Sequence, residues 1–256
     1  VSFALFSTIL LLRTKRADFI VIESPPLFLA PPGLLWARLT RSRSILNVAD
    51  LWPDAAVDVG AVSDGLMLSC ARGLERWAYR KSTYVSSVTR GIRSAVVERG
   101  VPEPRAVFLP NGVDTEAFSP DRGDASVRAE LGLPDDHLIA FTGTVGLAQG
   151  LGNVIDAIGS IGKQGVSFAI VGSGSALAEM RSRAVDGGYD NIFFVDPVPR
   201  QTIARLLPGC LAGVVSLADL ATNQGARPSK MFPIMASGIP ILYCGSGEGA
   251  SMVTSV

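Results

Sequence analysis

The sequence contains one histidine and three cysteines, and this scarcity excludes several kinds of site. A Ser-His-Asp triad or a zinc site built on histidines cannot be assembled around His137 alone. Cys70, Cys210 and Cys244 form no C-x-x-C pair and lie in apolar runs, which argues against a disulfide framework or a thiolate metal cage. There is also no Asp-x-Asp motif. We therefore expect a protein of the reducing cytoplasm that needs neither a metal nor a cofactor.

An excess of either charge is also lacking, because 23 lysines and arginines balance 23 aspartates and glutamates. Nothing in this balance favours a polyanion-binding surface, so nucleic acid is not an expected partner. The length of 256 residues suits one large domain or two of ordinary size, and we expect two.

A long hydrophobic run is missing as well. Residues 1–12 are mostly apolar and are followed by Arg13, Lys15 and Arg16, but a bilayer span needs about 20 apolar residues. The favoured interpretation is a buried helix of the first domain. The alternative is a helix lying on a negatively charged membrane face, which would make the protein peripheral on the inner membrane.

Short apolar runs alternate with amphipathic stretches along the whole chain, which is typical of an α/β fold with parallel sheets. The strands expected in the first half are residues 18–23, 44–49, 83–88 and 106–110. Those expected in the second half are residues 137–143, 166–172, 191–196, 211–217 and 239–245. A first domain over residues 1–118, a linker rich in Pro, Gly, Asp and Ser over 119–136, and a second domain over 137–256 account for this pattern.

For the helix expected over residues 66–81, the sequence also predicts the capping residue and the face that packs on the sheet. Ser63 or Asp64 is placed to cap it. Its periodicity turns Leu68, Leu74 and Trp77 towards a sheet and turns Arg72, Glu75 and Arg76 mostly outwards. Thr89 is placed to cap the next helix.

Two glycine loops follow strands of the second domain. The first contains Gly143, Gly146, Gln149 and Gly150, and its glycines would let backbone N–H groups approach a phosphate. A plain tight turn is an equal alternative. The second, from Gly172 to Gly174, could begin a dinucleotide fingerprint with Asp196 as the ribose acid, but Leu177 stands where a third small residue is needed.

A third loop, from Gly225 to Lys230, precedes an apolar helix-like segment. Arg227, Ser229 and Lys230 bring two cations and a hydroxyl to that junction. Such a group favours a phosphate-bearing ligand, although basic residues before a helix are often only solvated.

Two longer motifs carry a family resemblance over nearly the whole chain. Asn111-Gly112-Val113-Asp114, with Phe118 and Pro120, resembles the NGVD-x-x-x-F-x-P signature of family 4 glycosyltransferases. ARPSKMFPIMASGIPIL, followed by Gly247 and Glu248, resembles their donor-site segment. ESPPLFLAPPG, DLWPD and GTVGLAQG further resemble the branch that includes L-fucosamine transferases of bacterial O-antigen synthesis.

The resemblance implies a GT-B fold of two facing Rossmann-like domains, here incomplete at both termini. The first domain would bind the acceptor and the second the donor nucleotide-sugar, expected to be UDP-linked. It also implies an enzyme that transfers a hexosyl or aminosugar group with retention of configuration to a lipid-linked or saccharide acceptor. By position, catalytic roles fall to Lys230, Arg227 and Asp50. Substrate-binding roles fall to the following residues: Gly143, Gly146, Gln149, Gly150, Gly172, Gly174, Val198, Ser229, Glu248 and Asn111.

The chain also departs from the family pattern. The Glu-x7-Glu pair of many relatives corresponds to Gly225 and Pro233, and the phosphate-binding Lys and Arg correspond to Gln149 and Thr144. A leaving diphosphate carries growing negative charge, so we expect Arg227 and Lys230 to replace those cations. Asp50 would orient or deprotonate the acceptor, with a turn-capping role as the alternative. A nucleotide-sugar epimerase and an inert binding scaffold remain alternative functions.

Overall fold

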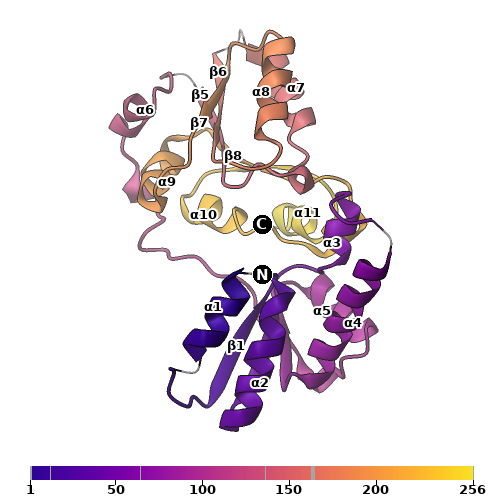
Figure 1. Cartoon of the computed structure of the whole chain (residues 1–256). Helices are drawn as coiled ribbons and strands as arrows, with labels where there is room; N and C mark the ends of the chain where they lie inside the picture. The colour runs from indigo at the N-terminus through magenta and orange to yellow at the C-terminus, as the bar shows by residue number, and fades with distance from the viewer. Residues whose placement is uncertain (1, 12, 64, 136, 163–164, 256) are drawn as a thin grey trace. The chain divides into compact units, whose positions relative to one another are not determined.

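The computed structural model describes residues 2–11, 13–63, 65–135, 137–162 and 165–255 (Figure 1). The predicted cap Asp64 and the last linker residue, Asp136, lie outside the described residues. The chain forms two compact units. Unit 1 comprises Val1–Asn111 and Gln224–Arg227, and unit 2 comprises Gly112–Asn223 and Pro228–Val256.

Unit 1 is built on a parallel sheet in the order β1-β2-β3-β4. Its strands are β1 (Phe19–Ser24), β2 (Arg43–Val48), β3 (Tyr84–Ser87) and β4 (Ala106–Phe108). Its helices are α1 (Ser2–Leu11), η1 (Leu27–Leu29), α2 (Ala30–Thr40), α3 (Asp54–Asp58), α4 (Leu66–Lys81), α5 (Arg90–Glu98) and η2 (Glu103–Arg105). One face of the sheet, carrying Ile22, Leu46 and Val85, packs against α2, α4 and α5 in a continuous apolar core.

Unit 2 is a second parallel sheet in the order β7-β6-β5-β8-β9. Its strands are β5 (His137–Thr142), β6 (Val166–Val171), β7 (Ile192–Val195), β8 (Ala212–Ser216) and β9 (Ile241–Cys244). Its α-helices are α6 (Ser126–Glu130), α7 (Gly152–Ile161), α8 (Leu177–Asp186), α9 (Arg200–Leu206), α10 (Met231–Ala236) and α11 (Gly247–Thr254). Its short 3-10 helices are η3 (Pro120–Arg122), η4 (Leu147–Gln149), η6 (Leu207–Gly209) and η7 (Ala221–Gly225), the last of which ends in unit 1.

Helices cover both faces of the second sheet. Figure 1 shows α7 and α8 on one side, where they enclose Phe141, Phe168 and Ile170, and α9 on the other, where its Leu206 packs with Leu138 and Val171. All pairings in this sheet are parallel, so the loops after β5, β6 and β8 leave the same edge. That edge carries the glycine loops.

All nine predicted strands are confirmed, with ends that differ by at most about two residues. The cap at Thr89 is also confirmed, because its Oγ1 accepts a hydrogen bond from the Ile92 amide at 3.0 Å. The predicted cap of α4 is wrong, since the N-cap residue is Gly65, which has no side chain to accept one. Among the described residues of the opening helix the buried interpretation is also wrong, because Phe3 and Phe6 are exposed.

Glu75 is the clearest error of the periodicity argument, because it is buried rather than outward. Its carboxylate accepts hydrogen bonds from Tyr79 Oη at 2.9 Å and from the Arg99 guanidinium at 2.5 Å. Arg99 also pairs with Asp54 at 2.7 Å, which ties α3 to α4. Desolvation raises the pKa of Glu75, while the charge of Arg99 opposes that rise. A buried charge of this kind is tolerated because its partners are in place.

Candidate functional site

The first glycine loop is fastened to its neighbours by backbone hydrogen bonds. Gly143 N donates to Val171 O at 2.9 Å, Val145 N donates to Ser173 O at 2.9 Å, and Ala176 N donates to Val145 O at 3.0 Å. On the other side, Ala218 N donates to Ala148 O at 2.9 Å. The loops after β5, β6 and β8 therefore form one rigid surface at the carboxyl edge of the sheet.

Gly172 and Gly174 are required by this packing. A Cβ atom at Gly172 would collide with the carbonyl oxygen of Gly143, and one at Gly174 would collide with that of Val145. Gly172 also has a φ of +151°, which L side chains rarely adopt. Gly172 and Gly174 were predicted to contact substrate. In the structure, both pack closely against the backbone of the first loop and support it.

Within the first loop, Gln149 folds back so that its Oε1 accepts a hydrogen bond from Gly146 N at 2.8 Å. Gly150 adopts a left-handed conformation with φ +57°, and a Cβ atom there would lie only 3.0 Å from the α-carbon of Ala218. Among the described residues, the amides of Thr144, Leu147 and Ala148 donate to no protein acceptor. Amides of this kind at the start of a helical turn are suited to an anion.

Asn223 is a site residue that the sequence reasoning missed. Its Nδ2 donates to Ala218 O at 2.9 Å and to Ala148 O at 3.3 Å, so its side chain joins η4 to the loop after β8. No motif marks this asparagine, because its role depends on joining a nearby carbonyl group, that of Ala218, to the carbonyl group of Ala148, which is remote from it in the sequence.

Lys230 lies beside the glycine loop in unit 2. Its Nζ is 3.6 Å from the centroid of the Phe141 ring, and its side-chain end lies 3.9 Å from the position of a Cβ on Gly143. The ammonium is buried and has no hydrogen-bond partner among the described residues. Burial lowers the pKa of Lys230 to about 8. A buried cation without a hydrogen-bond partner is costly, so this position is suited to an anionic ligand.

This burial predicts a pH-dependent stability. Between pH 8 and 10.5 the unfolded chain binds more protons than the folded one at Lys230, so the free energy of unfolding should rise with pH there. Lys230→Met removes the penalty and should stabilise the unliganded protein at pH 7 by on the order of 3 kcal/mol. Urea titrations at pH 7 and above pH 10 measure both effects. Equal free energies of unfolding for the wild type and Lys230→Met at pH 7 would contradict a buried Lys230 ammonium without a hydrogen-bond partner.

The other two predicted catalytic residues belong to unit 1. Arg227 lies in the segment Gln224–Arg227, which belongs to unit 1. Thr89 Oγ1 donates a hydrogen bond to Gly225 O of this segment at 2.6 Å. The Arg227 guanidinium lies 6.0 Å from the centroid of the Phe108 ring. Asp50 follows β2 in unit 1, and desolvation raises the pKa of its carboxyl although the residue has an exposed surface. Within unit 2, the structure brings Lys230 to the glycine loops.

The remaining predicted binding residues lie on four other segments of the two units. Val198 lies after β7 and packs against the apolar cluster around α9. Ser229 is exposed just before α10, and Glu248 is in the first turn of α11. Asn111 is an exposed residue at the end of the first segment of unit 1.

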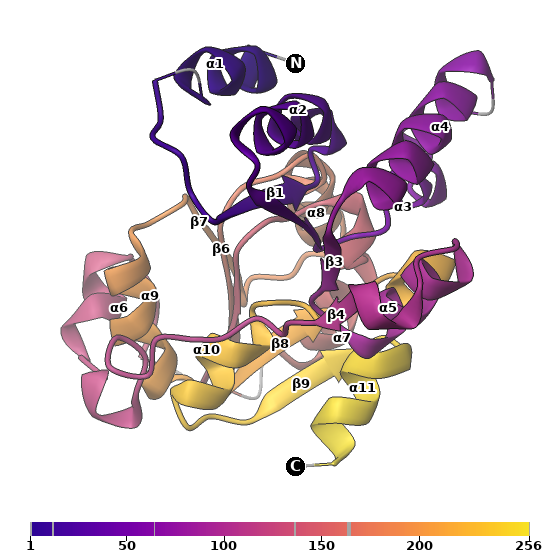
Figure 2. The ribbon, with the colours of Figure 1, turned by 90° about the horizontal axis from the view of Figure 1, so that it is seen from below.

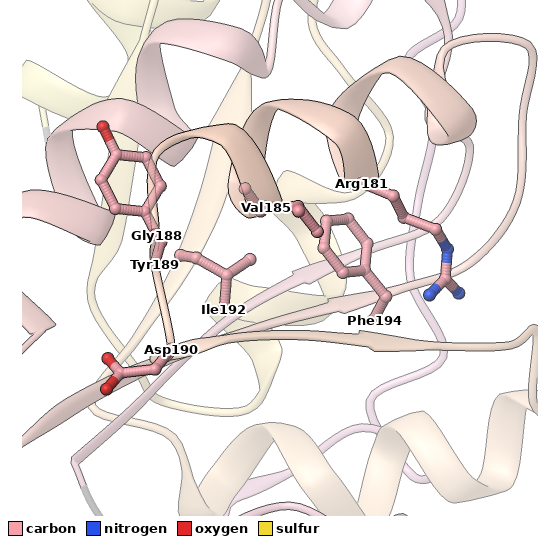
Figure 3. A pocket seen from close by; sticks show the side chains of 8 residues that line it. Arg181, Val185, Gly188, Tyr189, Asp190, Ile192 and Phe194 are labelled. Carbon is pink, nitrogen blue, oxygen red and sulfur yellow. The ribbon is translucent and has the colours of Figure 1, made fainter.

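A separate cavity lies on the edge strand of unit 2. It has a volume of about 350 Å³ and is lined by α8 and β7, with the Arg181 guanidinium 4.8 Å from the centroid of the Phe194 ring (Figure 3). None of the predicted site residues lines this cavity. The described residues also contain no group of three or more His, Cys, Asp or Glu side chains that could hold a metal ion.

Comparisons with known proteins connect this geometry to a family. A glycosyl transferase 4-like domain matches residues 2–112. The candidate colanic acid biosynthesis glycosyl transferase WcaI of Escherichia coli (strain K12) is 30% identical over 246 residues, which is 93% of this chain and 60% of WcaI. A GDP-mannose-dependent phosphatidylinositol monomannoside mannosyltransferase of Mycolicibacterium smegmatis is 23% identical, over 75% of this chain and 56% of that protein. The chain thus spans about 60% of the length of the curated relatives that it matches.

Solved structures show the same fold at low sequence identity. Anabaena Alr3699/HepE, crystallised with UDP and glucose, matches with a TM-score of 0.72 and 16% identity over 98% of this chain and 63% of its own. WaaG, a glycosyltransferase involved in lipopolysaccharide biosynthesis, matches with a TM-score of 0.64 and 13% identity over 90% of this chain and 68% of its own. The expected α/β architecture with parallel Rossmann-like sheets, the GT-B fold, is confirmed.

Proposed function

We propose that the protein is a family 4-like glycosyltransferase that transfers a sugar from a nucleotide-sugar donor during bacterial polysaccharide synthesis, because residues 2–112 match a glycosyl transferase 4-like domain and WcaI is 30% identical over 93% of this chain. The observation that carries this proposal is the buried, unpartnered Lys230 ammonium beside the glycine loop. Of the groups in a nucleotide-sugar, the diphosphate is the one that suits a position beside a buried cation. UDP and UDP-glucose are bound by structures of the same fold, which supports a UDP-linked donor.

The proposed donor site uses backbone and side chain together. The free amides of Thr144, Leu147 and Ala148 offer hydrogen bonds to phosphate oxygens, and Lys230 contributes the full positive charge that these dipoles lack. As the bond between the sugar and the diphosphate breaks, negative charge grows on the leaving oxygen. A cation held in place before the reaction stabilises that charge without reorganisation.

The acceptor is proposed to be lipid-linked or a saccharide, bound by unit 1. Its hydroxyl forms the new bond to the anomeric carbon on the face that the diphosphate leaves, which retains the configuration. Asp50 is proposed to orient that hydroxyl or to accept its proton. A carboxyl whose pKa is raised by desolvation is better matched to accepting a proton near neutral pH than a fully solvated one.

A thermal-shift screen against UDP, GDP and their sugars tests this proposal, because a ligand stabilises the folded protein in proportion to the logarithm of its concentration over its dissociation constant. We expect a nucleoside diphosphate to raise the melting temperature of the protein and the corresponding nucleoside to raise it less. The effect should survive EDTA, because Lys230 and amides supply the contacts. Loss of binding in EDTA would contradict the proposed phosphate contacts. Conversion of the donor without any acceptor would indicate an epimerase instead.

A further inference from the structure

The cavity between α8 and β7 borders an unpaired strand edge. β7 is the first strand in the order β7-β6-β5-β8-β9, and β9 lies at the other edge (Figure 2). The carbonyl groups of Asn191 and Val195 accept hydrogen bonds from the β6 side at 2.8 and 3.0 Å. Because backbone groups alternate in direction along a strand, Ile192 and Phe194 direct theirs away from β6, where no described strand pairs with them. This edge is therefore open to another strand.

Nothing within β7 blocks this edge. Natural proteins commonly protect an edge strand with a lysine, a proline or a β-bulge. The sequence of β7 is Ile-Phe-Phe-Val, and no bulge interrupts its register with β6. The adjoining surface of α8 is apolar as well, because Val185 is 78% exposed and lines the same cavity as Ile192 and Phe194 (Figure 3). An edge of this kind is suited to a polypeptide strand.

Opposite charges lie at the two ends of the cavity. The Arg181 guanidinium lies over the Phe194 ring near the carboxyl end of β7, and Asp190 lies before the amino end (Figure 3). Neither charge forms an ion pair with another described residue. The Asp190 end is held in place by Tyr189, whose ring packs so closely on Gly159 that a Cβ atom there would collide with it.

We propose that β7 pairs with β7 of a second copy of this chain in antiparallel orientation, so that the sheets of two copies of unit 2 join into one. This pairing relates the copies by a two-fold axis perpendicular to the sheet, which places both α8 helices on the same face. The axis also brings the Arg181 end of each cavity to the Asp190 end of the other. Arg181 then pairs with the partner's Asp190, and Val185 packs against the partner's Val185.

Charge complementarity favours a second copy over an unrelated strand as the occupant. A surface with a cation at one end and an anion at the other is complementary to itself when it is reversed. The two-fold axis performs this reversal, so the same ion pair forms twice in one interface. An unrelated strand would have to carry both opposite charges at matching positions.

Sedimentation velocity over a range of protein concentrations tests this pairing. We expect the wild type to show a reversible equilibrium between monomer and dimer. Arg181→Glu and Asp190→Arg should each weaken the dimer by at least about tenfold, because each places like charges opposite one another. The double variant should regain the affinity of the wild type, since both ion pairs form again with their charges exchanged. A general disturbance of folding would not produce this rescue.

Controls are taken from exposed residues of unit 2 that do not line the cavity. Val185→Lys should dissociate the dimer, whereas Asp186→Arg on α8 and Leu211→Lys before β8 should not. Lys230→Met should dimerise normally, and the Asp190→Arg protein should bind a nucleoside diphosphate like the wild type, which separates this surface from the donor site.

A wild type that stays monomeric at every concentration would overturn the proposal, because a different strand would then be the occupant of the edge. A dimer that survives both single charge reversals and Val185→Lys would also overturn it, because the copies would then associate through another surface.

Discussion

Lys230→Ala should lower kcat/KM for sugar transfer by at least about a hundredfold, mostly through kcat. A charged hydrogen bond to phosphate is worth about 1.5 to 3 kcal/mol, which corresponds to roughly tenfold to a hundredfold in binding. The transition state carries more charge on the leaving diphosphate than the bound donor does, so the rate should fall more than the affinity. Steady-state kinetics with varied donor concentration separates the two effects.

Arg181→Ala is the matched control for this prediction. Arg181 is also a cation of unit 2, but its guanidinium stacks over Phe194 on the edge strand β7. In the order of the sheet, β6 separates β7 from β5, the strand that the first glycine loop follows. Removal of the Arg181 side chain should leave kcat/KM nearly unchanged. Arg227→Ala is expected to be milder than Lys230→Ala. Turnover near the wild-type rate by a folded Lys230→Ala protein would place the phosphate contacts elsewhere.

Gly172→Ala should destabilise unit 2 by about 3 kcal/mol or more. The added methyl group would collide with the backbone carbonyl of Gly143, which cannot move without breaking the hydrogen bonds of the first loop, and the positive φ adds its own strain. Displacement of that loop should also weaken donor binding. Urea unfolding and nucleotide titration of the same preparation measure the two effects.

Gly132→Ala provides the comparison for Gly172→Ala. Gly132 also has a positive φ, +65°, but a Cβ there would meet nothing within 4 Å. Its substitution should cost only the backbone strain, about 1 kcal/mol. If Gly172→Ala were no more destabilising than Gly132→Ala, the close packing of the two glycine loops would be refuted.

The strand pattern could be predicted from the sequence because buried parallel strands are short apolar runs bounded by glycine and polar residues. Glu75 shows where such reasoning fails. A charged residue at a helical position normally faces water, and only the remote partner Arg99 makes its burial tolerable. The prediction that the opening helix is buried was wrong for a related reason. An apolar segment indicates burial only when another element packs against it.

Within the site, the glycine loops and Lys230 could be predicted as separate motifs, but their contacts could not. Lys230 is far from Phe141 in the sequence, and only the parallel order of β5 and β8 brings the segments after them to one edge. Gly172 was predicted to contact substrate by its position in the family resemblance. The structure shows a more specific need, because the neighbouring backbone leaves no room for a side chain. Asn223 carries no motif at all.

Calorimetric titration of a nucleoside diphosphate and its nucleoside into the wild type and Lys230→Met tests the central claim most directly. The base, uracil or guanine, is the one that gives the larger thermal shift. If the diphosphate lies beside the Lys230 ammonium, Lys230→Met should weaken diphosphate binding by roughly tenfold to a hundredfold and leave nucleoside binding unchanged. Equal diphosphate affinity in both proteins, or an equal loss for the nucleoside, would contradict the account.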